Sequence, residues 1–132
     1  MQLTVLTPHR KLIENVEVDE LIVPGHFGTL DILKGHADFV TPLVTGIMKW
    51  KHGSEWTTAA ISHGILEIFQ ENISVMVDVS EMGPEIDVNR AKKSRDVARQ
   101  KIEEGGLDDV NFRKYELKMK RAMARLNVSG EE

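Results

Sequence analysis

Histidines, serines and carboxylates are the side chains that could bind a metal or catalyse a reaction, and their spacing here argues against both uses. Histidine is a common metal ligand. However, no two of the four histidines between residues 26 and 63 are two or four residues apart, the spacings that place ligands on one face of a strand or helix. Ser62 and His63 are sequence neighbours without the nucleophile elbow that exposes a reactive serine. We therefore expect no metal site and no catalytic site. The four histidines are His26, His36, His52 and His63.

Positive charge is the second chemically suggestive feature, because it gathers in the last third of the chain. Residues 1–85 contain five Lys and Arg against twelve Asp and Glu, whereas residues 86–132 contain twelve against nine. The two parts therefore carry net charges of −7 and +3 within a chain of net charge −4. A basic pole can bind nucleic acid, anionic lipid, a nucleotide or an acidic protein surface, and it can equally be a solvated helix face.

Length and composition are those of an ordinary globular chain, with 132 residues of which 41% are hydrophobic and 29% charged. The chain has no cysteine, which excludes disulfides and thiolate metal sites. The longest run without a charged residue, Trp56 to Leu66, is far shorter than the roughly 20 residues of a membrane-spanning helix. We expect no direct membrane span and, because the opening residues lack a targeting pattern, no export.

Apolar and polar residues alternate over most of the first 80 residues, which predicts short β-strands. Their tight spacing is typical of an antiparallel sandwich, and no helix-length segment separates two strands. Trp50 and Trp56 flank a predicted turn, and we expect them to form a cross-strand pair. Strands are expected at Gln2–Thr7, within 9–23 around a turn at Glu14-Asn15, and at Gly46–Lys51, Trp56–Ile61, Ile65–Phe69 and Ile73–Val79, with turns at His52-Gly53 and Glu71-Asn72.

The stretch from Val23 to Leu43 interrupts the alternation with two prolines and three glycines. Proline blocks the continuation of a strand, and glycine supplies corners with positive φ. We therefore predict a bent surface loop over this stretch. Its apolar patches, Leu30–Leu33 and Phe39-Val40, are expected to be buried and to anchor the loop in the β core.

At Gly83-Pro84 the apolar period changes from two residues to about 3.6, the period of a helix. Residues 88–104 are predicted as a helix capped by Asp87. After Gly105-Gly106 a second helix should begin near Asp108-Asp109 and form an antiparallel hairpin with the first. The small side chains of the first helix bury little area, so the hairpin could undock and refold elsewhere. The expected seam is Ala91, Ser94, Ala98 and Ile102 against Phe112, Tyr115, Met119, Ala122 and Leu126.

The sequence thus predicts an α+β chain of two small domains, an antiparallel β-sandwich over 1–84 and a helical hairpin over 85–132. Four motifs run through it: V-P-G-x-x-G-x-L-x-I-L-x-G-H-A-x-x-V-T-P-L from Val23, A-I-S-H-G-I-L-E from Ala60, I-D-V-N-R-A from Ile86 and A-M-A-R-L-N-V from Ala122. In order and separation they resemble the epsilon subunit of F-type ATP synthases, which is homologous to the mitochondrial delta subunit. The resemblance covers essentially the whole chain.

The resemblance implies a non-catalytic rotor subunit in the central stalk of a proton-translocating ATP synthase, without an active site of its own. The sandwich would contact the gamma subunit and the c-ring and so help to couple ion flow to ATP synthesis. The hairpin would fold against the sandwich, or extend toward the catalytic alpha and beta subunits and inhibit ATP hydrolysis. Such a subunit would lie peripherally on the cytoplasmic face of the bacterial inner membrane.

Matching the family motifs position by position also assigns site residues. Three positions depart from the family pattern. Asp31 stands where a glycine is usual, Lys34 where a proline is usual, and His63 where the first glycine of the family's A-I-S-G-G-x-L-E pattern is usual. The loop facing the c-ring and gamma would contain Phe27, Thr29, Asp31, Leu33 and His36, with Thr29 and Asp31 exposed at its tip. The inhibitory basic helix would contain Arg113, Lys114, Lys118, Lys120, Arg121 and Arg125.

Some bacterial members of this family bind ATP through the I/L-D-x-x-R-A segment. ATP would be a regulatory ligand here, and no other cofactor is expected. The chain has no G-x-x-x-x-G-K-[ST] phosphate loop, so the site would be built from side chains. An N-cap at Asp87 and a solvated Arg90 explain the same segment without a ligand. The residues implied are Ile86, Asp87, Arg90 and Ala91, with Arg121 and Arg125 reaching the phosphates.

The alternative to a stalk subunit is a nucleic-acid-binding or other protein-interaction module that uses the basic carboxyl-terminal helices. Only one aromatic residue, Tyr115, lies near the arginines of the second helix. Packing against protein explains that helix at least as well as stacking on bases. We therefore expect protein partners and no nucleic acid.

Overall fold

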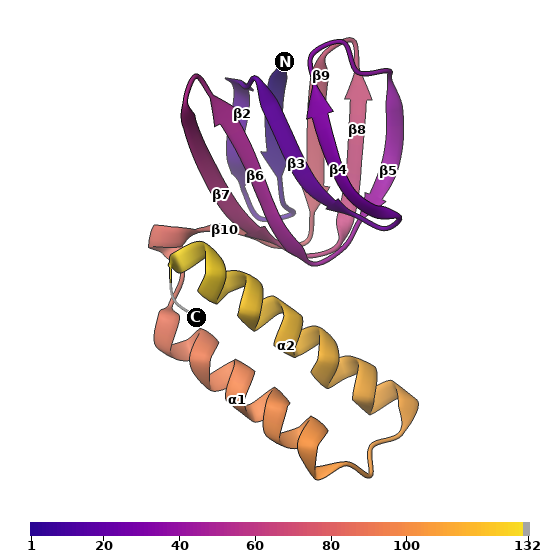
Figure 1. Cartoon of the computed structure of the whole chain (residues 1–132), viewed down its shortest axis with the longest axis vertical. Helices are drawn as coiled ribbons and strands as arrows, with labels where there is room; N and C mark the ends of the chain where they lie inside the picture. The colour runs from indigo at the N-terminus through magenta and orange to yellow at the C-terminus, as the bar shows by residue number, and fades with distance from the viewer. Residues whose placement is uncertain (131–132) are drawn as a thin grey trace.

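The structure is a computed structural model that describes residues 1–130, so residues 131 and 132 of the predicted hairpin domain lie outside the described part. It consists of a β-sandwich with a two-helix hairpin packed against one end (Figure 1), which confirms the predicted fold class. The elements are β1 Gln2–Leu6, β2 Lys11–Glu17, β3 Glu20–Gly25, β4 Gly28–Leu33, β5 Phe39–Leu43, β6 Gly46–His52, β7 Glu55–Ile61, β8 Gly64–Phe69, β9 Asn72–Val77, β10 Ser80–Met82, the 3-10 turn η1 Gly83–Glu85, α1 Val88–Glu104 and α2 Asp109–Ser129.

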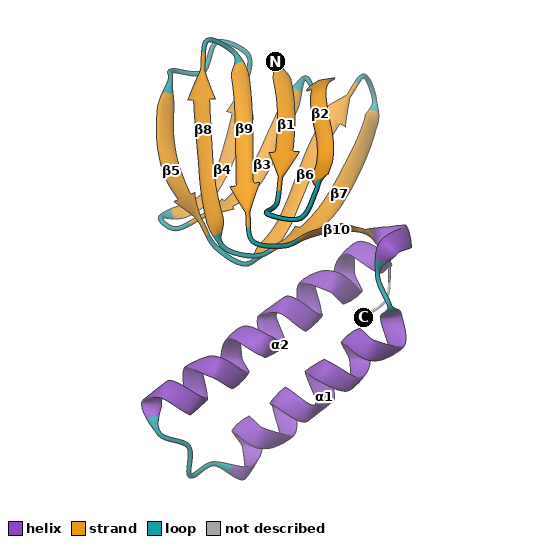
Figure 2. Cartoon of the chain, turned by 180° about the vertical axis from the view of Figure 1, so that it is seen from behind, coloured by secondary structure: helices purple, strands orange, loops and turns teal. Residues whose placement is uncertain are grey.

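The strands form one continuous sheet that folds over into two layers (Figure 2). Its order is β10-β7-β6-β3-β5-β8-β9-β1-β2, with β4 on the free side of β3. β3 and β5 share a single residue pair, Gly25 with Leu43, and the sheet passes from one layer to the other there. Adjacent strands run antiparallel except β1 and β9, which are parallel. The sandwich is therefore antiparallel with one exception that the sequence did not predict.

The core lies between the two layers because every second side chain of each strand points inward. Burial alternates strictly in β1, β3 and β8, as their residue patterns require. Burying such side chains contributes roughly 25 cal/mol per Å² of apolar surface. The largest fully buried side chains of the sandwich are Leu3, Val5, Val18, Leu21, Val23, Ile32, Met48, Leu66, Ile73 and Val75.

The stretch from Val23 to Leu43 departs most from the prediction, because it contains the end of β3, all of β4 and all of β5 rather than one bent loop. Pro24 and Pro42 lie inside strands. Their carbonyl oxygens still accept backbone N–H groups at 2.9 and 3.0 Å, so only the missing proline N–H is lost from the ladder. The expected apolar anchors are also wrong in part, since Leu33 is 51% and Val40 65% exposed.

Two predicted turns differ from those in the structure. Glu14-Asn15 is not a turn but an irregularity within β2, where Asn15 has a φ of 49° and the register with β1 shifts around Val5. An extra residue in one strand of a pair produces such a bulge, which sequence alternation alone does not separate from a turn. The turn expected at Glu71-Asn72 lies one residue earlier, at Gln70-Glu71, where both residues have positive φ.

The predicted tryptophan pair is wrong because the register of β6 and β7 places the two rings on opposite faces. Trp50 lies opposite Thr57, and Trp56 lies opposite Lys51. Trp50 is 5% exposed and belongs to the core, whereas Trp56 is 43% exposed on the outer face. A one-residue change in register moves every side chain to the other face, so equal distance from a turn does not ensure pairing.

Both helices begin where the sequence predicted. Asp87 caps α1 by accepting the backbone N–H of Arg90 at 3.1 Å, and Asp108 caps α2 by accepting that of Asn111 at 2.7 Å. Positive φ angles of 70° and 73° at Gly105-Gly106 end α1, as expected for glycine. Within the hairpin seam, Ala91, Ala98, Ala122 and Leu126 are buried.

The hairpin lies against the sandwich through α2 rather than α1 (Figure 1). The carboxyl-terminal part of α2 packs on β6, β7, β10 and η1. The other end of the hairpin projects beyond the sandwich, where Val110 at the start of α2 is 76% exposed. The docked area is thus confined to one end of one helix.

Candidate functional site

The residues expected to face the c-ring and gamma are spread along β4 instead of forming one loop tip. Phe27, in the turn between β3 and β4, is 87% exposed and forms the tip. Thr29, Asp31 and Leu33 are exposed along β4 itself. His36 follows in the next loop, so a six-residue strand, about 20 Å long, separates it from Phe27. The structure therefore places the set at two opposite ends of the sandwich.

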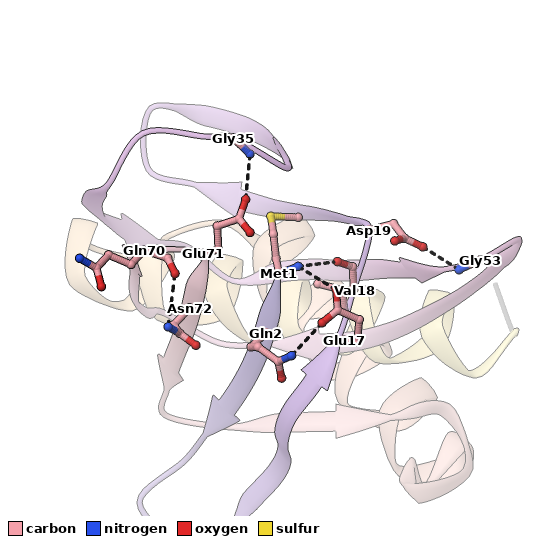
Figure 3. Close-up of polar contacts among 10 residues, drawn as sticks. All are labelled: Met1, Gln2, Glu17, Val18, Asp19, Gly35, Gly53, Gln70, Glu71 and Asn72. Atoms are coloured by element: carbon pink, nitrogen blue, oxygen red, sulfur yellow. Dashed lines mark hydrogen bonds and ion pairs between the residues drawn. The ribbon is translucent and has the colours of Figure 1, made fainter.

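The loop that carries His36 is fixed by neighbouring carboxylates. Glu71 accepts the backbone N–H of Gly35 at 3.2 Å, as Figure 3 shows. Asp38, in the same loop as Gly35, in turn accepts the backbone N–H of Gln70, the residue before Glu71, at 2.8 Å. These reciprocal bonds restrict the loop at the place where the family pattern has a proline that this chain lacks.

A second loop at the same end is held in a similar way. Asp19 accepts the backbone N–H of Gly53 at 2.8 Å (Figure 3). That hydrogen bond is the main cause that lowers the pKa of the Asp19 carboxyl, with smaller contributions from the charges of Lys34 and His52. This end of the sandwich is consequently stiffened by carboxylate-to-backbone bonds between loops.

Four exposed apolar residues form an outer apolar patch on the face of β5, β8 and β9 that points away from the core. Pro42 lies opposite Ile65, which in turn lies opposite Met76. Val40, on the same face of β5, is 65% exposed, and Ile65 and Met76 are 46% and 40% exposed. Next to it, a groove of about 490 Å³ extends along Ile65 and Met76 toward Leu6. Exposed apolar patches of this kind mark protein interfaces.

A pocket of about 380 Å³, called here the interdomain pocket, lies between the hairpin and the sandwich. Its sandwich side offers a hydroxyl and two carboxylates, whereas its helical side is mostly basic. Opposite charges therefore face each other across the docking surface. The lining residues are Ala60, Ile61, Ser62, Asp78, Val79 and Glu81 of the sandwich and Ser94, Lys114, Lys118, Arg121, Ala124 and Arg125 of the hairpin.

One ion pair crosses this pocket directly. Arg125 Nε lies 2.7 Å from Glu81 Oε1, and the two side chains are 33% and 26% exposed. The contact is a charge-assisted hydrogen bond that ties α2 to β10. Because both groups are only partly exposed, salt screens the pair less than it would a fully solvated one.

The predicted inhibitory set divides into two groups in the docked hairpin. Lys114, Lys118, Arg121 and Arg125 line the interdomain pocket and so face the sandwich of the same chain. Arg113 and Lys120 are exposed, and Lys120 Nζ lies 3.8 Å from Glu116 on the same helix. Docking therefore turns four of the six basic side chains toward the sandwich.

The structure does not bring the six predicted ATP residues into one cavity. Arg121 and Arg125 line the interdomain pocket, whereas Ile86 and Ala91 are buried at 8% and 3% exposure at the start of the hairpin. The Asp87 carboxylate is engaged as the N-cap of α1, and Arg90 is exposed. The pocket instead adds residues that the sequence did not assign to nucleotide binding. These are Ser62, Asp78, Glu81 and Ser94.

Within residues 1–130, no group of three or more His, Cys, Asp or Glu side chains is placed to hold a metal ion. None of the described helices combines the length and the apolar character needed to cross a membrane.

Comparison with known families accounts for nearly the whole chain. The family model described as "ATP synthase, Delta/Epsilon chain, beta-sandwich domain" matches residues 1–83, and that described as "ATP synthase, Delta/Epsilon chain, long alpha-helix domain" matches residues 85–130. The ATP synthase epsilon chain of Geotalea daltonii is 31% identical over 131 residues, which cover 99% of this chain and 94% of the relative. That of Citrifermentans bemidjiense is 33% identical over 133 residues, with the same coverage.

Solved structures share the fold at lower sequence identity. A chain in the Euglena gracilis mitochondrial ATP synthase, in its OSCP/F1/c-ring part, superposes with a TM-score of 0.82 at 19% identity over 99% of this chain and 81% of its own length. A chain in the central stalk and c-ring of the Tetrahymena thermophila enzyme gives 0.63 at 12% identity, over 97% and 95%. With both domains matched in order and relatives aligned over nearly their full length, this chain belongs to the delta/epsilon chain family of ATP synthases.

Proposed function

We propose that this chain is a non-catalytic central-stalk subunit whose sandwich joins gamma to the c-ring and whose hairpin restrains ATP hydrolysis. The observation that carries the proposal is the contrast between its two parts. Hydrogen bonds join the loops of the sandwich, which exposes the outer apolar patch. The hairpin, by contrast, contacts the sandwich through the basic carboxyl-terminal part of α2. The solved relatives of this fold belong to F1/c-ring and central-stalk assemblies.

The outer apolar patch is the surface that we assign to gamma. Its members come from three neighbouring strands of one stiff layer, so they can transmit force without local unfolding. The loop carrying His36 is fixed at one end of β5, the strand that supplies Val40 and Pro42. Protein contacts through this patch would hold the chain peripherally at the cytoplasmic face of the membrane.

Binding to gamma tests this assignment. Ile65→Glu places a charge in the middle of the outer apolar patch and should weaken binding to purified gamma at least tenfold in an interferometry or calorimetry experiment, because a charge cannot be buried unpaired. Trp56→Glu is the matched control, since Trp56 is similarly exposed but lies on the other layer. Equal losses in the two variants would contradict the assignment of the patch.

The surface that we assign to the c-ring is the start of β4 with the turn before it, at the end of the sandwich opposite the His36 loop. Phe27 projects from the tight turn after β3, and Thr29 follows it at the exposed start of β4. A rigid turn that presents one aromatic ring and small polar groups suits contact with polar loops. Phe27→Ser should therefore weaken retention on c-ring-containing complexes while leaving binding to gamma unchanged, and loss of both would contradict the division of surfaces.

The hairpin is assigned as the brake on hydrolysis. Four basic residues of α2 face the sandwich when docked, so an extended hairpin would present them to another acidic surface. The Arg125–Glu81 ion pair crosses the docking surface, and Arg125 can exchange this partner for a carboxylate of another acidic surface. Glu81→Gln removes the sandwich partner of Arg125 without changing the helix, and it should increase inhibition of ATP hydrolysis by the assembled complex.

A regulatory nucleotide site in the interdomain pocket is a second proposal, favoured by the basic lining and by a volume within the range of roughly 300–1,000 Å³ of ligand pockets. Arg121 and Arg125 would donate to phosphate oxygens, and the Ser94 hydroxyl lies in the same lining. ATP bound there would bridge hairpin and sandwich and so favour the docked state. Because the Ile86 to Ala91 segment lies outside this lining, its contribution would be to position α1.

Calorimetric titration of the full chain with ATP tests this second proposal. Arg121→Gln should reduce affinity by tenfold or more, whereas Arg113→Gln, an exposed arginine of the same helix outside the pocket, should change it little. No heat of binding with the unmodified chain, or equal losses in the two variants, would contradict a nucleotide site in this pocket.

A further inference from the structure

Arg10 occupies a position from which it holds the segment that joins the sandwich to the hairpin. It lies in the turn between β1 and β2, where its backbone is fixed on both sides by Thr7: the Thr7 N–H donates to the Arg10 carbonyl at 2.8 Å, and the Arg10 N–H donates to Thr7 Oγ1 at 3.1 Å. The guanidinium of this anchored residue donates to the Glu85 carboxylate and, through Nη2, to the Ser80 carbonyl at 2.8 Å. One side chain therefore grips both ends of residues 80–85.

Hydrogen bonds within and just after residues 80–85 also hold this segment in shape. Glu85 accepts the backbone N–H of Met82 at 3.0 Å, and the Ile86 N–H donates to the Gly83 carbonyl at 3.1 Å. Strand β10 pairs with β7 over residues 80–82. Residues 80–85 thus belong mechanically to the sandwich, although the Gly-Pro pair at 83 and 84 looks like a linker in the sequence.

The first backbone beyond this grip is extended and short. Ile86 and Asp87 both have extended backbone angles and separate η1 from the first turn of α1. Asp87 caps α1 and therefore moves with the helix. The backbone bonds of Ile86 and Asp87 that follow the Ile86 N–H are consequently the ones that can rotate while the Arg10 contacts and the Ile86–Gly83 bond stay intact.

We propose that Arg10 clamps residues 80–85 to the sandwich and thereby places the pivot of the hairpin at Ile86-Asp87 rather than at Gly83-Pro84. This pivot rests on the mobile hairpin proposed above, and the clamp adds where the hairpin turns and which residue fixes that point. Arg10 is a positioning residue, because it acts on the hairpin only through Glu85 and Ser80.

Charge balance at the docking surface supports the same arrangement. Glu81 loses Arg125 when the hairpin leaves, and an unpaired carboxylate would oppose that step. Glu85 and, to a smaller degree, Glu81 raise the pKa of the Arg10 guanidinium, so both carboxylates lie within its electrostatic reach. Because Arg10 donates to the carbonyl of Ser80, the residue before Glu81, its positive charge stays near Glu81 after Arg125 has gone and lowers the cost of undocking.

An isolated exposed ion pair contributes little to global stability, so the effect of the clamp should be measured as local protection of the backbone amides. Backbone hydrogen exchange by NMR on the full chain measures that protection at the Met82 and Ile86 amides. Arg10→Gln should speed exchange at both about tenfold, while the Ser62 amide, bonded to Val79 within the sandwich at 3.0 Å, should be unaffected.

Matched variants separate the clamp from a general effect of the β1–β2 turn. Lys11→Gln changes the adjacent basic residue. Its ion pair is with Glu14 and does not involve residues 80–85, so this variant should leave the Met82 and Ile86 amides protected. Arg10→Lys keeps one charge but cannot donate to two acceptors from one planar group, so it should restore only part of the protection. Equal exchange in the Arg10→Gln and Lys11→Gln chains would overturn the clamp.

The position of the pivot needs an undocked hairpin, which Arg125→Glu should provide by facing Glu81 with like charge. Because the chain has no cysteine, spin labels on cysteines at the exposed positions 27 and 110 report the distance between sandwich and hairpin. We expect this distance to lengthen while Met82 and Ile86 stay protected. Loss of protection at these amides with Arg10 intact would overturn the pivot. An unchanged distance would contradict hairpin mobility and the pivot with it, whereas the clamp is still decided by the exchange comparison.

Discussion

At the scale of single residues, two neighbours in the A-I-S-H-G-I-L-E segment show why one glycine of the family pattern can change and the other cannot. A Cβ built on Gly64 would lie 2.1 Å from the Met76 carbonyl oxygen and 2.7 Å from the Val77 Cα, both backbone atoms of β9. His63, which replaces the first glycine of the pattern, is exposed. The second glycine is therefore required by close approach of two strands.

Gly64→Ala should destabilise the sandwich by about 1–3 kcal/mol, since strands β8 and β9 must separate to admit the methyl group. His63→Ala should change the free energy of unfolding by less than about 0.5 kcal/mol, as expected for an exposed position. Urea unfolding followed by tryptophan fluorescence measures both. A Gly64→Ala chain as stable as the unmodified one would contradict the close approach of β8 to β9.

Asp19 gives a prediction for pH dependence. Its carboxyl pKa is lowered in the folded chain by the Gly53 N–H, so the ionised form is favoured on folding. The stability from this bond is therefore present above the unfolded pKa of about 3.9 and is lost as the pH falls through the lower folded value. Thermal unfolding at pH 7 and pH 3 should show a smaller acid-induced drop in Asp19→Asn than in the unmodified chain. The same drop in both would contradict the contribution of this bond.

Residue-level prediction from sequence succeeded where the signal is local. Asp87 was recognisable as a cap because an N-cap bonds an amide only three residues away, and the second helix was expected to begin near Asp108-Asp109, where Asp108 is the cap. Partners distant in sequence, such as Arg10 with Glu85 or Arg125 with Glu81, carry no local signal, since both depend on how β10 and α2 pack. The candidate site is made largely of such distant pairs, which is why its sandwich side was missed.

At the scale of elements, helices were predictable and the proline-rich stretch was not. A helix period, the Asp87 cap and the glycine pair at 105 and 106 predicted the bounds of α1 and a start of α2 near Asp108-Asp109. Pro24 and Pro42 argued for a loop, but each lies where its missing N–H is tolerated and its carbonyl oxygen remains bonded. The donors of those bonds are the N–H groups of Val44, just after β5, and of His26, just after β3, and composition does not reveal these pairings.

The contact between η1 and α2 gives an element-scale prediction. A Cβ at Gly83 would lie 2.9 Å from the Val128 carbonyl oxygen near the end of α2. Gly83→Ala should therefore weaken docking of the hairpin by about 1–3 kcal/mol without unfolding the sandwich. The distance between labels at positions 27 and 110 should lengthen, whereas Pro84→Ala, at the exposed neighbouring position, should leave it unchanged. An unchanged distance in both would show that this contact does not hold the hairpin.

At the scale of the whole molecule, the sandwich and the hairpin are two parts of different stability, because the hairpin is docked only through the basic carboxyl-terminal part of α2. Since opposite charges face each other across the interdomain pocket, raising salt should weaken docking in the isolated chain. Between about 50 mM and 500 mM salt, we expect the undocked population measured with the same spin-label pair to rise several-fold. A salt-independent population would mean that apolar contacts around Ala124 hold the hairpin.

The division of labour between an anchoring sandwich and an inhibitory hairpin is the central claim. The direct test is ATP hydrolysis by an alpha-beta-gamma complex from the same source, with the full chain and with a chain that ends at Ile86, after the clamped segment. We predict that both bind the complex and that only the full chain suppresses hydrolysis. Binding of both without any difference in hydrolysis would contradict the inhibitory role of the hairpin, and failure of both to bind would contradict the proposed place of the chain in the stalk.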